Sequence, residues 1–514
     1  MAHTSFDMQA FHAQIDDAVK KHFPPSSPPT LPHPSALTRA AASLPKVSDA
    51  LSKPLGVSAT TAHLLEDIVP ALSGQALSPR YYGFVTGSVH PAAQAAEAVV
   101  AALDQNVQVH LPDQTIATDV EASALDLLAD LFGLSHPQTG APRGIFTGRT
   151  FTTGATGSNI LGLACAREHV LARRVPPGSP SMGELGILGA CVAAGVTEIQ
   201  VLTSMGHSSL SKAASVVGLG RASVKQMAKS PERPWLLDVD AVERELVARD
   251  GTGVATIIAV SAGEVNTGLF AAGKEDMERL RALADRYGSW IHVDGAFGIF
   301  AAALAPGTVF DKLRERVSGV HLADSIAVDG HKLLNVPYDC GMFFTRSLPT
   351  LTNVFTNPNA AYLASSAGAP IPSPLNVGLE NSRRFRALPA YAVLRSEGRK
   401  GMAAMLGRMV ELARRIACFV RDSEHYDWLP NGEADVDDTH IIVLLRAKDV
   451  TLNDELVARI NETRDMYVSG TSWGGQKAVR VAIGSWRVDV ERDFAVVEAI
   501  LSAVAEGRPY TAAV

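Results

Sequence analysis

Hydrophobic and polar residues along this chain are arranged in two alternating kinds of element. Three short runs rich in apolar and β-branched residues have the length of buried strands: EIQVL at residues 198–202, ATIIAV at 255–260 and SWIHVD at 289–294. Helical runs, such as residues 274–286, separate them. Strands that alternate with helices predict an α/β domain built on a mostly parallel sheet. Ligands bind beyond the carboxyl ends of the strands in such sheets, so residues that follow a strand are the first candidates for chemistry.

The N-terminal part of the chain has a different pattern. An amphipathic start with Phe11, Ile15 and Val19 leads into PPSSPPTLPHPS, whose prolines forbid a helix and favour an extended connector. Residues 92–134 are rich in alanine and leucine at helical spacing. We therefore expect an N-terminal arm and helical segment at residues 1–90.

The C-terminal part returns to strands and helices in another order. The run GMFFTR at residues 341–346 is followed by a proline- and alanine-rich loop to residue 375 and by a long helical segment at residues 383–420. Two further strand candidates, HIIVLL and AVRVAI, come after this helix. The pattern predicts a large domain at residues 91–380 and a small C-terminal α+β domain at residues 381–514.

Composition and charge exclude several classes of protein. The 514 residues include 46 Lys and Arg against 53 Asp and Glu, which argues against a basic nucleic-acid-binding protein. The four cysteines are far apart and have no metal-ligand spacing, so we expect neither a disulfide scaffold nor a metal site. The first residues lack the pattern of a secretory signal, and the longest apolar stretches are shorter than the roughly 18 residues of a membrane span. We expect a cytoplasmic protein with no nucleic-acid or membrane partner.

The stretch DSIAVDGHKLLNVPYDCG at residues 324–341 is the most informative about chemistry. Lys332 follows His331 in a context of small residues and precedes an apolar turn. Burial disfavours the ammonium form, so a partly desolvated lysine there can condense with an aldehyde. A surface lysine on a loop is the alternative interpretation.

Asp294 ends the apolar strand SWIHVD, where an unpaired carboxylate is costly. It can hold the ring nitrogen of pyridoxal phosphate protonated, which lets the ring accept electrons. Alternatively, it caps the following helix.

Two further segments suit the same ligand. FTTGATGSN at residues 151–159 opens a helical run, and free N–H groups at a helix start bind phosphate, although such residues also serve simply as caps. His207 follows the strand at residues 198–202 and is therefore expected at the same sheet edge as Asp294. A lone histidine is more often a packing residue, but this position favours ring stacking or proton transfer.

Together and in this order, the motifs resemble the fold-type I pyridoxal-phosphate enzymes of the group II decarboxylase family, which includes aromatic-amino-acid, glutamate and histidine decarboxylases. The resemblance extends from about residue 79 to residue 485. Its most specific parts are HVDGAFG, ADSIAVDGHKLLNVPYDCG and SRRFRALPAYAVLRSEGR. It implies a large domain with a mostly parallel seven-stranded sheet flanked by helices, pyridoxal 5′-phosphate as cofactor, and a homodimer.

The resemblance also implies roles for individual residues. Lys332 is expected to form the covalent link to the cofactor, and Asp294 to pair with the pyridine nitrogen. His207 is expected to stack on one face of the ring and to act in catalysis. The other expected contacts are Ala296 on the second ring face, Ala155 and Thr156 at the phosphate, Ser325 and His331 near the phosphate or the lysine, and Phe84, Val85 and His110 at the substrate, with His110 reaching the neighbouring subunit's pocket.

Three positions depart from the family pattern. Glu264 stands where many relatives have threonine, so a hydroxyl contact near the cofactor is lost or replaced. Asp329 stands where others have asparagine, and its charge repels a phosphate unless it is turned away. The loop at about residues 357–375 has no tyrosine at the place where the aromatic-amino-acid decarboxylases carry a catalytic one; Tyr362 lies earlier and is interpreted as a packing residue.

These observations predict an enzyme that decarboxylates an L-amino acid to an amine and carbon dioxide. Phe84 and its small, apolar neighbours favour a hydrophobic or aromatic substrate. The nearest alternative is decarboxylation coupled to oxidative deamination, which yields an aldehyde, because the loop tyrosine is missing. Another lyase or transaminase reaction on the same cofactor, and a family member without catalytic activity, are further alternatives; the set of Lys332, Asp294 and His207 argues against the last.

Overall fold

A seven-stranded sheet with the strand order β1-β7-β6-β5-β4-β2-β3 forms the centre of the large domain. The structure is a computed structural model, which describes residues 8–45, 51–135, 144–358, 371–430 and 435–511. The strands are β1 (Gly148–Thr152), β2 (Glu198–Thr203), β3 (Val224–Gln226), β4 (Val254–Ser261), β5 (Trp290–Asp294), β6 (Ser325–Asp329) and β7 (Gly341–Thr345). Only β7 pairs antiparallel with both of its neighbours, which confirms the predicted seven-stranded, mostly parallel sheet.

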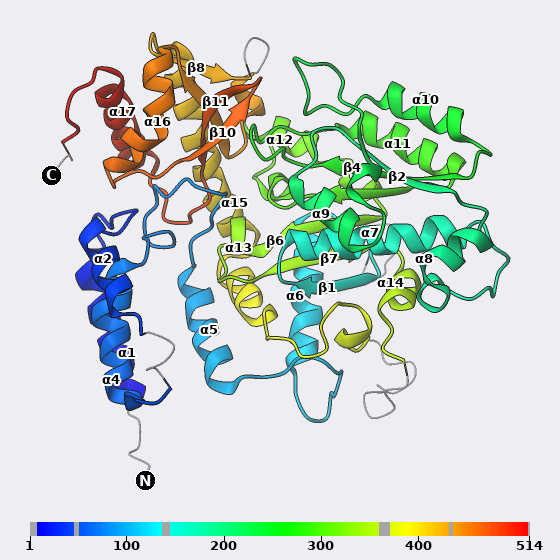
Figure 1. The fold of residues 1–514 in the computed structure, drawn as a ribbon, viewed down its shortest axis with the longest axis horizontal. Helices are drawn as coiled ribbons and strands as arrows, with labels where there is room; N and C mark the ends of the chain where they lie inside the picture. The colour runs from blue at the N-terminus through cyan, green and yellow to red at the C-terminus, as the bar shows by residue number, and fades with distance from the viewer. Residues whose placement is uncertain (1–7, 46–50, 136–143, 359–370, 431–434, 512–514) are drawn as a thin grey trace.

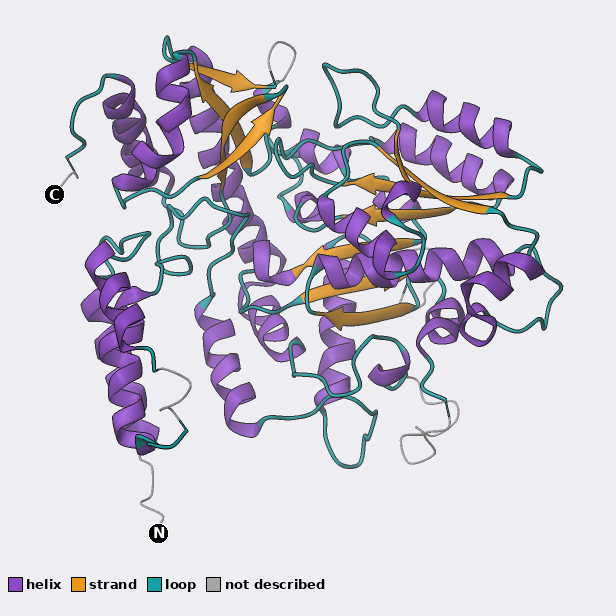
Figure 2. Ribbon diagram, viewed as in Figure 1, coloured by secondary structure: helices purple, strands orange, loops and turns teal. Residues whose placement is uncertain are grey.

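Helices cover both faces of this sheet (Figures 1 and 2), as a parallel sheet requires. All residues of β4 are buried, which explains its continuous apolar sequence. Helix α7 (Ala155–Ala172) packs against β4, β5, β6 and β7 and begins at the sheet edge where the parallel strands β4, β5 and β6 end. The other helices of this domain are α8 (Met182–Ala193), α9 (Ser208–Val216), α10 (Val239–Arg249), α11 (Lys274–Tyr287), α12 (Asp311–Arg316), α13 (Gly330–Leu333) and α14 (Leu348–Phe355).

The C-terminal part contains a second, smaller sheet with the antiparallel order β10-β11-β9-β8. The long helix α15 (Ala387–Asp422), with a non-helical kink at Gly398, leads into it from the large domain. The remaining elements are β8 (Tyr426–Leu429), β9 (Ile442–Ala447), α16 (Val450–Glu462), β10 (Ser469–Trp473), β11 (Gln476–Ala482) and α17 (Val490–Ala505). The predicted small α+β domain is therefore confirmed in its content, while the proposed limits at residues 90 and 380 stay a prediction.

The N-terminal helices stand beside the main body as an arm (Figure 1). They are α1 (Met8–His22), α2 (Pro34–Ser43) and α4 (Gly56–His63), followed by a π-helical turn (Leu64–Ile68) and a 3-10 turn (Val69–Ala71). Helix α2 begins at Pro34, inside the stretch predicted to be extended, because proline fits the first position of a helix. The helical run predicted at residues 92–134 is two helices, α5 (Pro91–Leu103) and α6 (Ala117–Leu131). Among the described helices, none is both long and apolar enough to cross a membrane.

Candidate active site

A cavity of about 310 Å³ lies at the carboxyl ends of the parallel strands. Its wall includes the last residues of three neighbouring strands, Ser261 of β4, Asp294 of β5 and Asp329 of β6. The start of α7 and the α13 residues His331 and Lys332 complete it. The cavity therefore lies where ligands bind in open α/β sheets, and its volume is within the range of small-molecule sites.

Most of the residues singled out in the sequence meet at this cavity. The wall contains Lys332, Asp294, His207, Ala296, Ala155, Thr156, His331 and Phe84. Val85 is buried and is not part of the wall. His110 is buried too and bonds to the Thr118 hydroxyl, so within one chain it does not contribute to this cavity.

Ser325 lies behind the cavity, contrary to the expectation that it touches the phosphate or the lysine. It is the first residue of β6, whereas the cavity borders the last, Asp329. Four steps of about 3.3 Å along a strand separate the two ends. The Ser325 hydroxyl instead bonds to two side chains of β5, Trp290 and His292.

Lys332 and Asp329 form an ion pair in the floor of the cavity. Lys332 Nζ lies 2.8 Å from Asp329 Oδ2, and the Asp329 side chain is only 5% exposed. The other carboxylate oxygen, Oδ1, accepts the backbone N–H of Ala155 at 2.5 Å. The carboxylate is thus turned to the lysine and to the first residue of α7, which compensates its charge.

The start of α7 packs closely against His331 and brings backbone N–H groups to the cavity. Gly154 precedes the helix with a φ of 149°, and a Cβ there would lie 3.1 Å from His331 Cε1. The N–H groups of Thr156 and Gly157, in the first turn of α7, have no acceptor within the helix. Both residues line the cavity, so these donors and the positive helix end are available to an anionic group.

Asp294 is held at the end of β5 by two hydrogen bonds. Its Oδ2 accepts from Asn159 Nδ2 at 2.9 Å, and its Oδ1 accepts from the backbone N–H of Ala296 at 3.2 Å. Both partners donate, so the carboxylate is bound as an acceptor. Asn159 belongs to the motif FTTGATGSN but had no predicted role; the available signal was an amide that follows a run of small residues at the start of a helix.

His207 is a neutral ring in the wall. Its Nδ1 accepts from the backbone N–H of Ser209 at 3.1 Å, which places the ring proton on Nε2. Burial lowers the pKa of His207, and Asp294 opposes this effect only in part. A neutral imidazole beside the cavity can stack on an aromatic ring without adding charge.

Glu264 serves the loop after β4 rather than the cavity. Its buried carboxylate accepts from the backbone N–H groups of Asn266 and Thr267 and from both of their side chains. Its neighbours Gly263 and Val265 line the cavity. Glu264 therefore holds the loop in shape. Burial raises its pKa, while the two backbone N–H donors counteract that rise.

The site fits pyridoxal phosphate. It combines a lysine, a carboxylate fixed at a strand end, a neutral imidazole and a helix start with free N–H groups, each on the wall of one cavity. The described residues include no group of three or more His, Cys, Asp or Glu side chains that could hold a metal ion.

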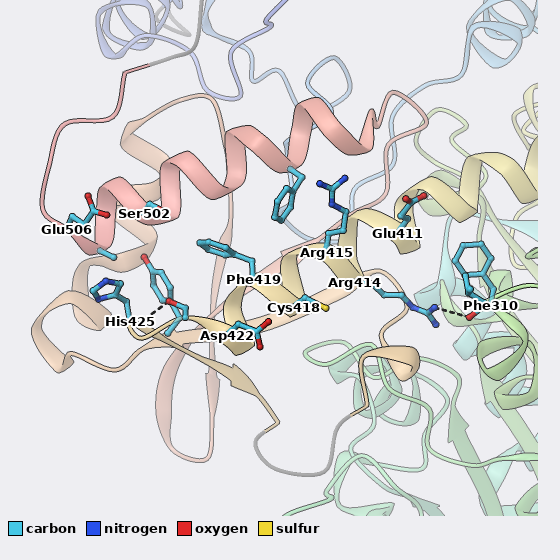
Figure 3. Close-up of a pocket in the computed structure, with 15 residues that line it drawn as sticks. Phe310, Glu411, Arg414, Arg415, Cys418, Phe419, Asp422, His425, Ser502 and Glu506 are labelled. Atoms are coloured by element: carbon cyan, nitrogen blue, oxygen red, sulfur yellow. Dashed lines mark hydrogen bonds between the residues drawn. The ribbon is translucent and has the colours of Figure 1, made fainter.

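A larger cavity, of about 940 Å³, lies elsewhere, between α15 and α17 (Figure 3). Both of its arginines are paired with neighbouring groups: Arg415 with Glu491, and Arg414 with the Val309 carbonyl. None of the residues singled out in the sequence lines it. Size alone therefore does not identify the functional site, and the chemistry is concentrated at the smaller cavity.

Comparisons with known proteins agree with the cofactor that this site fits. The family description "Pyridoxal-dependent decarboxylase conserved domain" matches residues 69–436. An L-2,4-diaminobutyrate decarboxylase of Acinetobacter baumannii is 28% identical over 345 residues, 65% of this chain and 62% of that protein. Tryptophan decarboxylase 1 of Oryza sativa subsp. japonica is 25% identical over 438 residues, 83% of this chain and 80% of that protein.

Solved structures show the same fold. The crystal structure of Oryza sativa TDC with PLP and tryptamine superposes with a TM-score of 0.80 at 22% identity, covering 99% of this chain and 100% of the other. A glutamate decarboxylase domain from Vibrio parahaemolyticus superposes with a TM-score of 0.76 at 22% identity, covering 98% and 96%. With most of its length matched by the family description, the chain belongs to the pyridoxal-dependent decarboxylase family.

Proposed function

We propose that this protein decarboxylates an L-amino acid with a hydrophobic or aromatic side chain, with pyridoxal phosphate as cofactor, and releases the amine and carbon dioxide. The observation that carries the proposal is the meeting of Lys332, Asp294 and His207 at one cavity on the carboxyl edge of the sheet.

Each of these residues has a distinct task. When bound, pyridoxal phosphate supplies an electron sink for the bond that breaks at the substrate's α-carbon. Lys332 would hold the cofactor covalently, and Asp294 would hold the proton on its ring nitrogen. Thr156 would donate its backbone N–H to the phosphate as expected, and Gly157 would take the place expected for Ala155, whose N–H is already bound by Asp329. His207 would pack against the ring, and both its Nε2–H and Lys332 Nζ are available at the cavity as proton donors.

The mouth of the cavity favours an apolar substrate side chain. Phe84 lines the cavity and is 64% exposed, so its ring is available to a ligand. The rings of Tyr81 and Tyr467 stack behind it, 4.4 Å apart, and the centroid of Tyr467 lies 6.5 Å from that of Phe84. Aromatic surfaces of this kind gain free energy by covering apolar groups.

A homodimer is part of the proposal. The described part of the N-terminal arm exposes large apolar side chains: Leu37, Leu44, Leu51, Leu55, Val57, Leu64 and Leu72. A series of exposed leucines is typical of a protein–protein interface, and a second copy of the chain would cover it. His110, which the family resemblance assigns to the neighbouring subunit's pocket, stays a prediction, as does a cytoplasmic location.

The reaction is tested by product analysis. The purified protein, supplied with pyridoxal phosphate, is incubated with each of the twenty amino acids, and carbon dioxide, amine, aldehyde and peroxide are measured together. We expect equal amounts of amine and carbon dioxide from an aromatic or large aliphatic substrate, without oxygen uptake. Release of keto acid without carbon dioxide would instead show transamination.

Oxidative deamination is the second candidate, and one observation favours it. The segment ASSAGAPIPSPLN contains no tyrosine to assist protonation of the α-carbon. Most of this loop, residues 359–370, lies outside the described part of the structure. Oxygen uptake equal to carbon dioxide release, with aldehyde as product, would replace the amine-forming reaction by this one.

A further inference from the structure

A continuous chain of hydrogen-bonded side chains runs behind the cavity and ends at Asp294. Trp290 Nε1 lies 2.9 Å from Ser325 Oγ, and the same hydroxyl lies 2.8 Å from His292 Nδ1. His292 Nε2 lies 2.9 Å from Asn159 Oδ1. Asn159 Nδ2 then donates to Asp294 Oδ2 at 2.9 Å.

The fold brings these residues together from three elements. Trp290, His292 and Asp294 alternate along β5 and therefore share one face of the sheet. Ser325 is the register partner of His292 on β6. Asn159 comes from α7, which approaches so closely that a Cβ at Gly162 would lie 2.3 Å from the His292 ring.

The two ends of the chain determine where every proton lies. The Trp290 indole can only donate, and an ionised Asp294 can only accept. Ser325 therefore accepts from Trp290 and gives its single proton to His292 Nδ1. His292 then carries its own proton on Nε2 and donates it to the Asn159 oxygen, which leaves the Asn159 N–H₂ group facing Asp294.

Solvent does not compete with this arrangement. Ser325, His292 and Asn159 are 0% exposed, and Trp290 is 1% exposed. Burial lowers the pKa of His292 to about 4, so the ring is neutral near pH 7. The hydrogen bonds require this neutral form, because His292 Nδ1 must accept from Ser325 and only Nε2 can carry the proton.

Asn159 also connects this hydrogen-bonded chain to His207 in the cavity wall. Its Nδ2 lies 3.1 Å from Ser209 Oγ, and that hydroxyl lies 2.7 Å from His207 Nδ1. The orientation of a single amide is therefore shared by Asp294 and by His207.

We propose that Trp290, Ser325 and His292 are positioning residues that orient the Asn159 amide and thereby keep Asp294 ionised toward the cofactor's ring nitrogen. If the amide were reversed, its oxygen would face Asp294, and the carboxyl group would have to take up a proton to avoid two opposed acceptors. A protonated Asp294 no longer holds the ring nitrogen in its charged form. The expected effect on the cofactor rests on the proposed function. The positions of the protons do not, because they involve only side chains of the protein.

The arrangement is tested first in the cofactor-free protein by ¹⁵N NMR of labelled histidine. We expect His292, assigned by comparison with His292→Gln, to carry its proton on Nε2 with Nδ1 unprotonated throughout pH 6 to 8. A proton on Nδ1, or a doubly protonated ring in this range, would overturn the inference whatever reaction the enzyme catalyses.

A pair of matched serine variants tests the effect on the cofactor. Ser325→Ala removes one member of the hydrogen-bonded chain. Ser289→Ala removes another buried hydroxyl, from the residue just before β5. Within the described ranges, Ser289 Oγ has no hydrogen-bond partner. Cofactor affinity is measured by fluorescence titration, and the protonation of the ring nitrogen by NMR of bound ¹⁵N-labelled pyridoxal phosphate.

We expect Ser325→Ala to weaken cofactor binding by up to about tenfold, the effect of one lost hydrogen bond, and to move the ring-nitrogen signal toward the unprotonated form. Ser289→Ala should change neither. Melting curves identify any general loss of folding. Equal affinity and equal ring-nitrogen signals in the two variants would refute the positioning role. Failure of the wild-type protein to bind pyridoxal phosphate would refute the proposed function instead.

Discussion

Replacement of Asp294 by asparagine separates the charge of this side chain from its shape. In the structure both carboxylate oxygens accept a hydrogen bond, one from Asn159 Nδ2 and one from the Ala296 backbone. An asparagine has one oxygen and one N–H₂ group, so in either orientation one of these donors faces another donor. A buried donor without an acceptor costs about 1–3 kcal/mol. At roughly 2–4 °C per kcal/mol in a large domain, the melting temperature should fall by several degrees.

The loss of activity in Asp294→Asn should exceed what this destabilisation explains. The variant still folds, but it lacks the negative charge that holds the ring nitrogen protonated. Hydrogen bonds to charged groups contribute about 1.5–3 kcal/mol, and each 1.36 kcal/mol of barrier is a factor of ten in rate. We therefore expect kcat to fall by about 10- to 150-fold at saturating cofactor, well below the melting temperature, as measured by carbon dioxide release.

Asp324→Asn is the matched control. Asp324 bonds to Arg281 at 2.9 Å and accepts the backbone N–H of Ile291 at 2.8 Å, but it precedes β6 and lies at the edge of the sheet opposite the cavity. This variant should lose stability and keep its kcat. Activity of Asp294→Asn within tenfold of the wild type would show that Asp294 is structural, and an equal loss of kcat in both variants would attribute the effect to destabilisation.

Other expectations concern the lysine, pH and assembly. Lys332→Ala should abolish turnover and leave no borohydride-reducible link to the cofactor; mass spectrometry that finds another labelled residue would refute the assignment. Burial lowers the pKa of His292 to about 4 and that of His440 to about 3, so both favour the neutral form in the folded state. As the pH falls, these histidines are protonated in the unfolded chain before they are protonated in the folded protein. The free energy of unfolding, measured by urea titration, should therefore be constant above about pH 6.5 and decrease as the pH falls toward 4. His440→Phe should weaken this dependence, and a stability that rises on acidification would contradict it. Sedimentation analysis should show a dimer, and a fully active monomer would rule out a pocket completed by two subunits.

The sequence alone determined the large domain and the main chemical groups, because both depend on local patterns. Each predicted central strand became a strand, since a short run rich in apolar and β-branched residues is stabilised when both faces of the sheet are covered. Asp294 and His207 follow such strands, and the carboxyl ends of parallel strands share one edge of a sheet. Their meeting at one edge was therefore predictable before any coordinates, whereas Lys332 was expected beside them only through the family resemblance.

Only the tertiary structure decided how these groups are held. Ser325 stands in the same motif as Lys332, yet the length of β6 places it behind the cavity and against His292. Asp329 looked unfavourable for a phosphate, but the start of α13 turns it to Lys332 and to Ala155, which is 174 residues away along the chain. Such contacts depend on the order of strands in the sheet and on the distance at which α7 packs across it. No local pattern encodes either quantity, because both result from the packing of the whole core.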